Sequence, residues 1–163
     1  MTEFYDSARF GLIPAGSDAM LYADGRYQAT TEDARRFNRV RWITVLGGAA
    51  AAARTGAIDY ERGNLAYEGS QLRDWATARQ AMGCRARVYC NRSDLPRAMS
   101  AVAGLPKVCW WLATLDGNLR SAAELAADIL ELGITLAEEK LWACQYAGGM
   151  TAEYDTSVLY GEW

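Results

Sequence analysis

Short runs of apolar and β-branched residues alternate along the chain with longer segments whose apolar residues recur at helical spacing. The short runs predict strands. We expect these strands at residues 3–7, 19–23, 41–46, 57–60, 85–90, 108–114 and 141–146. After the pair Gly148-Gly149, the segment Tyr154-Asp155-Thr156-Ser157 predicts a final short strand that closes the sheet.

Helices are expected between the strands, at residues 31–37, 70–82, 94–103 and 121–132. The first follows Thr30, a good N-cap, and the second and fourth stop at Gly83 and Gly133, which are natural C-caps. Strands that alternate with helices are typical of a mostly parallel sheet or barrel. We therefore predict an α/β fold, a compact or irregular (β/α) TIM-barrel-like domain. Without any repeat or linker, it should span residues 1–163 as a single domain.

Charge and composition exclude several function classes. The net charge of -3 gives no electrostatic reason to bind nucleic acid or an anionic membrane, so neither is an expected partner. The run Arg85-Ala86-Arg87 is too small to change this. No apolar stretch is long enough to insert into a membrane, and the N-terminus has no signal-peptide pattern, which predicts a cytoplasmic or virion-associated protein.

The chain has no histidine, so a zinc site and a histidine-assisted nucleophile are not expected. The glycines after residue 46 match neither GxGxxG nor GxxxxGK[ST] and predict a tight connection in preference to a nucleotide site. We expect no cofactor and no metal. Acid-base chemistry would fall to Asp, Glu, Tyr or Lys.

The sharpest local signal is Ile58-Asp59-Tyr60-Glu61, in which a predicted strand ends in two carboxylates two residues apart. In a strand this spacing points both side chains to the same face, where each raises the cost of ionising the other. One acid that stays protonated and one that stays charged suit glycoside hydrolysis. The same pattern also occurs in solvated turns, salt-bridge anchors and metal sites.

Three further acids, Asp6, Asp116 and Asp155, are expected at the C-terminal ends of strands. In (β/α) barrels the carboxyl ends of the strands carry the active site, so these acids could join Asp59 and Glu61 there. Each has a structural alternative. Asp116 precedes Gly117 and suits a turn, Asp6 could cap the next segment, and Asp155 could make a closing-strand contact.

Aromatic and amide side chains near strand ends add a second indication of carbohydrate binding. Sugar rings pack their C–H faces on aromatic rings, while their hydroxyl groups bind amides and carboxylates. Most of the aromatic residues must lie in the core. The candidate substrate-binding residues are Tyr22, Tyr60, Tyr89, Asn91, Trp111, Asp116 and Gln145.

Five short elements, in order along the chain, resemble the glycoside hydrolase family 25 lysozymes and, more closely, the glycoside-hydrolase-like domains of actinobacteria and their phages. The elements are Tyr5-Asp6-Ser7, Ile58-Asp59-Tyr60-Glu61, Val88-Tyr89-Cys90-Asn91, Trp110-Trp111-Leu112-Ala113, and Trp142-Ala143-Cys144-Gln145-Tyr146 followed by Tyr154-Asp155-Thr156-Ser157. The resemblance implies a muramidase-like enzyme without a cofactor that cuts peptidoglycan glycan strands. It also implies that Glu61 is the general acid, that Asp59 is its electrostatic or nucleophilic partner, and that Asp6 and Asp155 line the same site.

Two other readings stay open. The chain could be a catalytically silent module that binds cell-wall glycan in a virion or phage tail, with virion or tail proteins as partners; the short chain and the lack of a signal peptide suit it. It could also be a metal-dependent hydrolase that uses Asp59, Glu61 and Asp116 as oxygen ligands.

Overall fold

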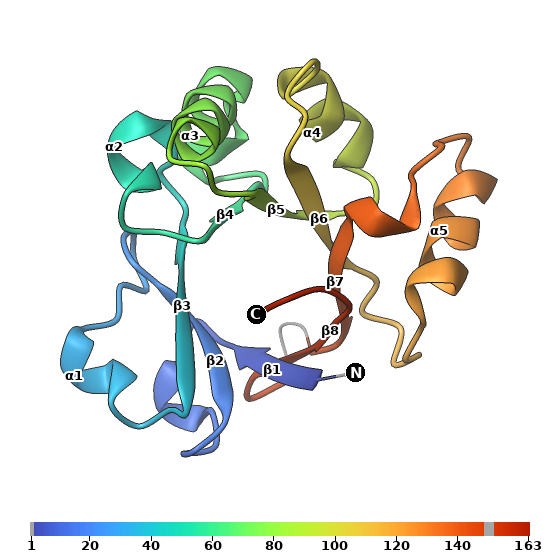
Figure 1. The fold of residues 1–163 in the computed structure, drawn as a ribbon. Helices are drawn as coiled ribbons and strands as arrows, with labels where there is room; N and C mark the ends of the chain where they lie inside the picture. Colours follow the sequence, from blue (N-terminus) through green and yellow to red (C-terminus); the bar gives the residue numbers. More distant parts are fainter. Residues whose placement is uncertain (1, 149–151) are drawn as a thin grey trace.

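Eight strands form one closed barrel in the computed structural model, which describes residues 2–148 and 152–163 (Figure 1). The strands follow one another around the barrel in chain order. They are β1 (Thr2–Asp6), β2 (Asp18–Tyr22), β3 (Arg39–Thr44), β4 (Ala57–Asp59), β5 (Ala86–Asn91), β6 (Val108–Ala113), β7 (Leu141–Ala147) and β8 (Asp155–Leu159).

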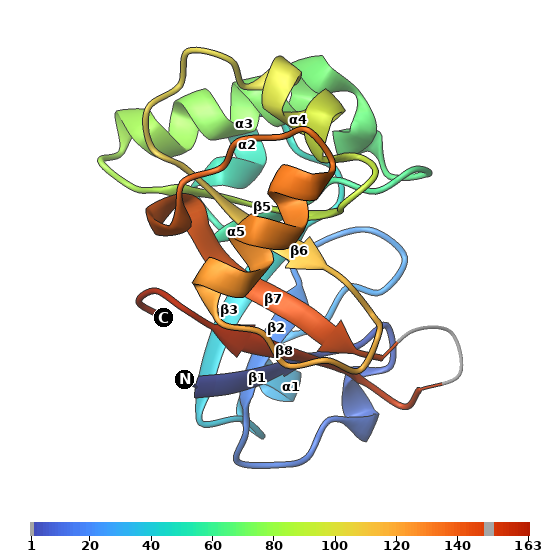
Figure 2. The same cartoon turned by 90° about the vertical axis from the view of Figure 1, so that its right-hand side faces the viewer.

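The barrel is mixed. Strands β1 to β7 pair in parallel, whereas β8 is antiparallel to both of its neighbours, β7 and β1. The helices lie outside the strands, as two views show (Figures 1 and 2). They are α1 (Thr31–Ala34), α2 (Gly48–Ala52), α3 (Gly69–Ala81), α4 (Leu95–Ala101) and α5 (Ala122–Glu131), with 3-10 turns at Phe10–Leu12, Leu65–Tyr67 and Glu138–Lys140.

The prediction of an α/β, (β/α) TIM-barrel-like fold is therefore wrong. A regular alternation needs a helical crossover after every strand, but β1 and β2 are joined through a single 3-10 turn and the helix predicted at 31–37 forms only at Thr31–Ala34. Because β8 runs antiparallel, it returns from β7 without a crossover helix. The fold is a closed mixed β-barrel with few helices.

Alternate residues of each strand fill the interior of the barrel. This interior contains an aromatic cluster in which the rings of Phe4 and Trp111 lie 5.1 Å apart and those of Phe4 and Trp142 lie 5.6 Å apart. A register shift on β6 and β7 pairs Trp110 with Leu141 and Trp111 with Ala143, so Trp142 is skipped by the pairing. This bulge lets Trp142 join the interior cluster.

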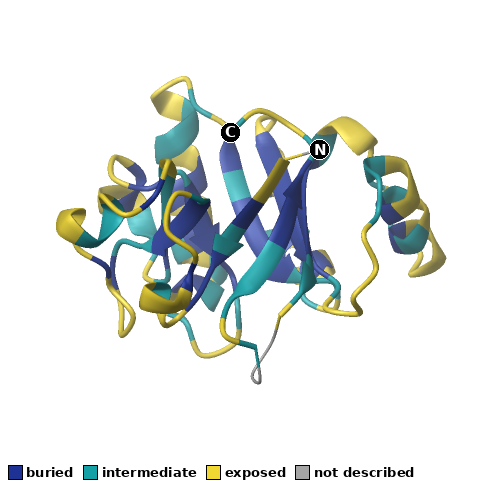
Figure 3. Cartoon of the chain, turned by 90° about the horizontal axis from the view of Figure 1, so that it is seen from below, coloured by how far each residue is buried: buried dark blue, intermediate teal, exposed yellow. Residues whose placement is uncertain are grey.

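A second apolar layer lies between the strands and the helices. Helix α3 buries Leu72, Trp75 and Ala76, and the indole of Trp75 donates a 2.9 Å hydrogen bond to the buried hydroxyl of Thr55. The strands are mostly buried and the outer helix faces are exposed (Figure 3). Within the described residues, no helix has the length and apolar character needed to cross a membrane.

Candidate functional site

Acidic side chains from strands that are far apart in sequence meet at one edge of the barrel. Asp6 ends β1 and Asp59 ends β4, both at the carboxyl edge of the parallel strands. Asp155 begins β8, but because that strand is antiparallel, its first residue lies at the same edge and pairs directly with Asp6. Glu61 follows Asp59 by two residues and interacts electrostatically with it. The structure thus brings the four candidate catalytic residues together.

Asp59 is the most enclosed of these acids, with 3% of its surface exposed. The hydroxyl of Tyr22 donates a 3.4 Å hydrogen bond to Asp59 Oδ2, and the amide of Asn64 donates one of 3.4 Å to the backbone carbonyl of Asp59. Oδ1 of Asp59 is buried without a hydrogen-bond partner. Burial and then the charge of Glu61 raise the pKa of Asp59 well above its usual range.

Glu61 is partly exposed and therefore can reach a ligand. The amide of Asn91, at the end of β5, donates a 3.0 Å hydrogen bond to Glu61 Oε1. Burial raises the pKa of Glu61, while the hydrogen bond from Asn91 opposes that rise by favouring the carboxylate. The net effect is an acid that holds its proton to higher pH than an ordinary glutamate.

Asp6 is 6% exposed, and its Oδ2 is buried without a hydrogen-bond partner. Burial, followed by the charges of Asp155 and Asp59, raises the pKa of Asp6 well above its usual range, and a hydrogen bond with Asp155 adds to this. Several carboxyl groups that share one desolvated edge cannot all ionise near neutral pH. The cluster therefore retains protons that it can release or transfer.

Polar pairs from the inward faces of β5 to β8 lie beneath the acids. The hydroxyl of Tyr89 donates a 2.5 Å hydrogen bond to Gln145 Oε1. The indole of Trp111 donates a 3.0 Å bond to the hydroxyl of Ser157. All four side chains are buried, so Tyr89, Trp111 and Gln145 support the site from inside the barrel.

Two candidate residues lie elsewhere. Tyr60 is fully buried on the opposite face of its strand, where it packs beneath the helices and accepts a 3.1 Å hydrogen bond from Arg97. Asp116 is exposed in a turn and pairs with Arg120 at 2.6 Å, an interaction that lowers the pKa of Asp116. Among the described side chains, no group of three or more Cys, Asp or Glu is arranged to hold a metal ion.

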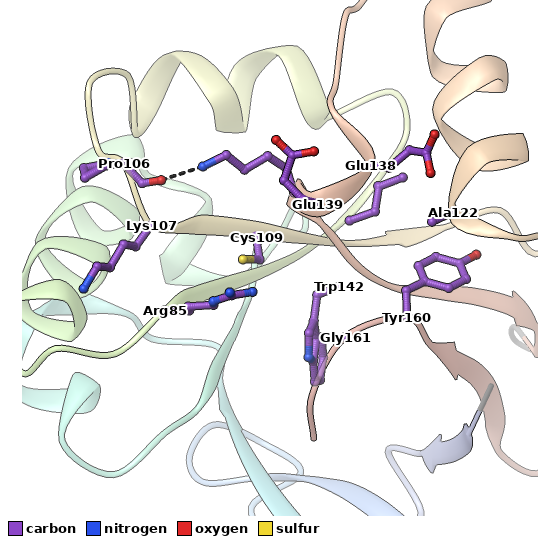
Figure 4. A pocket seen from close by; sticks show the side chains of 12 residues that line it. Arg85, Pro106, Lys107, Cys109, Ala122, Glu138, Glu139, Trp142, Tyr160 and Gly161 are labelled. Atoms are coloured by element: carbon purple, nitrogen blue, oxygen red, sulfur yellow. Dashed lines mark hydrogen bonds between the residues drawn. The ribbon is translucent and has the colours of Figure 1, made fainter.

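Two cavities differ in their relation to the acids. One of about 440 Å³ adjoins the acidic edge and is lined by Asn91, Arg92, Ser93, Ala113, Thr114 and Leu132. A second, of about 500 Å³, contains none of the candidate residues and is bordered by Arg85, Lys107, Cys109 and Trp142 (Figure 4). Asn91 lines the first cavity and donates a hydrogen bond to Glu61, so that cavity lies nearer to the acids than the second does, although none of the acids lines it.

Ser157 and Asn64 belong to this environment but are absent from the residues selected by sequence. A signal for Ser157 was present, since it lies two residues after Asp155 on the same strand face. Asn64 bonds back to Asp59 through a turn whose geometry has no sequence signature of its own.

The site thus combines the buried acid Asp59, the more accessible acid Glu61 with a raised pKa, and the Tyr22 phenol and Asn91 amide that hold them in place. Such a set can donate a proton, stabilise a developing positive charge and bind hydroxyl groups.

The chain matches no family model, and no curated protein or solved structure matches it either. What the site does must therefore be inferred from its own geometry.

Proposed function

We propose that this chain is a peptidoglycan-directed glycoside hydrolase of the muramidase type, with Glu61 as the proton donor. The observation that carries the proposal is the coupled pair of Asp59 and Glu61, one enclosed and one accessible, at an edge that also holds Asp6 and Asp155. Glycoside hydrolysis uses two carboxyl groups in different protonation states and needs no cofactor.

Glu61 suits the part of general acid. Burial raises its pKa, although that of Asp59 is raised further, so this role requires substrate binding to move the proton of the pair from Asp59 to Glu61. Its hydrogen-bond partner Asn91 lines a cavity, which places Glu61 near a space for the glycosidic oxygen. Its proton passes to that oxygen as the bond between the oxygen and the anomeric carbon breaks. Water then adds to the anomeric carbon and returns a proton to Glu61, which completes the hydrolysis.

Asp59 suits electrostatic stabilisation of the transition state. In the free protein burial makes its ionisation costly, as its raised pKa indicates. Positive charge that develops on the sugar ring would lower this cost, so the interaction strengthens as the reaction proceeds and contributes to the rate. The hydrogen bond from Tyr22 holds one Asp59 oxygen in place.

The unpartnered oxygens of the site support a polyhydroxylated substrate. Oδ2 of Asp6 and Oδ1 of Asp59 are both buried without hydrogen bonds. Buried polar atoms are usually paired, so these oxygens are positions where a ligand hydroxyl or amide could donate. The further assignment to cell-wall glycan depends on the resemblance of the short elements around Asp6, Asp59 and Glu61 to family 25 lysozymes.

The test is release of reducing sugar from purified peptidoglycan by the wild-type protein, Glu61→Gln and Glu131→Gln. Glu131 is an exposed glutamate at the end of α5, so its variant controls for the loss of one carboxylate. We expect Glu61→Gln to lower the rate by about 100-fold or more, with Glu131→Gln unchanged. Equal rates for the wild type and Glu61→Gln would refute the assignment.

One observation favours a second candidate, a catalytically silent module that holds cell-wall glycan, for example with virion or tail proteins. Asp6 and Asp59 are almost fully enclosed, so a sugar could contact them only where they meet the carboxyl edge of the barrel. A wild-type protein that releases no sugar but sediments with insoluble peptidoglycan, and loses that binding in Asn91→Ala, would establish this candidate in place of the enzyme.

A further inference from the structure

Three arginines gather at the end of the barrel opposite the acids. Arg41 lies on β3, Arg79 on α3 and Arg87 on β5. The charge of Arg79 acts on Arg41, and the charges of Arg41 and Arg79 act on Arg87. The guanidinium groups of Arg41 and Arg87 lie 5.9 Å and 5.1 Å from the ring centre of Trp142. Trp142 therefore holds the two cations near each other.

These arginines have no acidic partner among the described residues. By contrast, Arg39, near the same end, is neutralised by an ion pair with Asp18. The Nε atoms of Arg41, Arg79 and Arg87 are all buried without a hydrogen-bond partner. Within the described part of the chain, the one hydrogen bond of their guanidinium groups is the 3.2 Å bond that Arg79 donates to the carbonyl of Ala52.

Such an arrangement of partly buried, unpaired charges is costly. Burial and then the charge of Arg41 lower the pKa of Arg87 to about 10, and burial followed by the charge of Arg79 lowers the pKa of Arg41. Buried charges in proteins are normally paired, because an unpaired one loses its hydration without compensation. A bound anion would supply the missing partner.

Space for an anion exists beside the cluster. A cavity of about 300 Å³ is lined by two of the three, Arg41 and Arg79, together with Arg54, Thr55 and Trp163, among others. Arg87 does not line this cavity but lies over the same Trp142 ring as Arg41. The neighbouring cavity of about 500 Å³ is lined by Arg85, Lys107 and Trp142 and also by the acids Glu138 and Glu139, so the arginine-lined cavity is the better place for an anion (Figure 4). Gly56 preserves the position of Arg41, since a Cβ there would lie 2.8 Å from Arg41 Cγ.

We propose that Arg41, Arg79 and Arg87 form a binding site for a tetrahedral oxyanion, a phosphate or sulfate group that is free or carried on a larger molecule. The planar fork of a guanidinium matches the oxygens of such a group, and three neighbouring guanidinium charges can neutralise a divalent anion. The volume fits a small ligand of this class. The proposal is independent of the proposed hydrolase activity, since it uses none of the acids.

The test is titration of the full chain with inorganic phosphate and, separately, with glycerol phosphate, against sodium chloride at matched ionic strength. Thermal unfolding and calorimetry report the binding. We expect saturable binding of one or both phosphates, weakened about tenfold or more in Arg87→Gln and in Arg41→Gln. Binding of glycerol phosphate alone would identify a phosphate carried on a larger molecule.

Arg73→Gln is the matched control. Arg73 lies on the same helix as Arg79, is exposed, and likewise bonds backbone carbonyls, those of Ala101 and Ala103. The Arg73→Gln variant should bind phosphate as the wild type does. If a strand variant fails to fold, Arg79→Gln on the helix tests the same site. The absence of saturable binding to the wild type, or unchanged binding by the folded arginine variants, would overturn the proposal.

Discussion

The side-chain amide of Asn91 donates a 3.0 Å hydrogen bond to Glu61 Oε1 and so joins the end of β5 to the acid that follows β4. This bond favours the carboxylate form of Glu61, whereas burial favours the protonated form. The protonation state of the proposed general acid therefore depends on a balance that one substitution can change.

Removal of this bond should raise the pKa of Glu61. In Asn91→Ala burial would act on Glu61 with less opposition, so its carboxyl should titrate at higher pH than in the wild type. Carbon-13 NMR of the glutamate carboxyl groups measures this directly. In an active protein, the alkaline limb of the pH-rate profile should move the same way.

Asn118→Ala is the control for this prediction, because Asn118 is exposed in the turn after Asp116 and its side chain makes no hydrogen bond in the described structure. A Glu61 carboxyl that titrates at the same or lower pH in Asn91→Ala would show that the bond does not control its protonation.

Asp6→Asn should stabilise the protein, and more so as the pH rises. The pKa of Asp6 in the folded chain is raised well above 3.8, by burial and by Asp155 and Asp59. Below the ordinary carboxyl pKa, Asp6 is protonated in both the folded and the unfolded chain, and an asparagine resembles it. Above that pKa, Asp6 ionises in the unfolded chain but not in the folded chain, so ionisation destabilises the fold increasingly until the pH passes the pKa of Asp6 in the folded chain.

We expect the variant to gain on the order of 1–3 kcal/mol over the wild type at pH 8, and little near pH 4. Urea unfolding at both pH values measures the difference. Asp74→Asn, at an exposed position on α3, should show no such pH-dependent gain. A variant of Asp6 that is less stable than the wild type at pH 8 would contradict this account.

The positions of the strands could be predicted from the sequence, because short apolar runs such as the one at residues 108–114 have no other way to be buried. The direction of the last strand could not. The antiparallel orientation of β8 follows from its pairing with β1 and β7, which depends on contacts across the whole chain. Helical patterns also overestimate the helices, as at α1, where a capped start is followed by only one turn.

The acids of the site were only partly predictable. Asp6 and Asp59 lie at the carboxyl ends of parallel strands, which share one edge of the barrel, whereas Asp155 reaches that edge because it begins the antiparallel strand β8 and does not end a strand as expected. Of the arginines at the other end, Arg87 was noted only within the short run Arg85-Ala86-Arg87, and Arg41 and Arg79 were missed because they are far from it in sequence. Arg87 lies two residues before Tyr89, on the same inward face, and this spacing was the available signal.

Ser157→Ala should destabilise the barrel interior. The hydroxyl of Ser157 accepts the hydrogen bond of the buried Trp111 indole at 3.0 Å, and both residues are nearly inaccessible to water. Loss of the acceptor leaves a buried N–H unpaired, at a cost of about 1–3 kcal/mol. Urea unfolding measures it. Ser100→Ala, at an exposed position on α4, should cost far less, and equal costs for the two variants would contradict the role of this bond.

Gly148→Ala should disturb the acidic edge through Asp155. The backbone of Gly148 has φ +134°, and a Cβ there would lie 1.9 Å from Asp155 Oδ1 and 2.9 Å from its Cα, so the backbone itself must move. Because Asp155 pairs with Asp6, this movement should also lessen the rise in the Asp6 pKa. Gly104→Ala is a matched control, since Gly104 has φ +82° but open space around it. We expect Gly148→Ala to cost at least about 1 kcal/mol more than the control in urea unfolding, and an equal cost would show that the hairpin accommodates the methyl group without displacing Asp155.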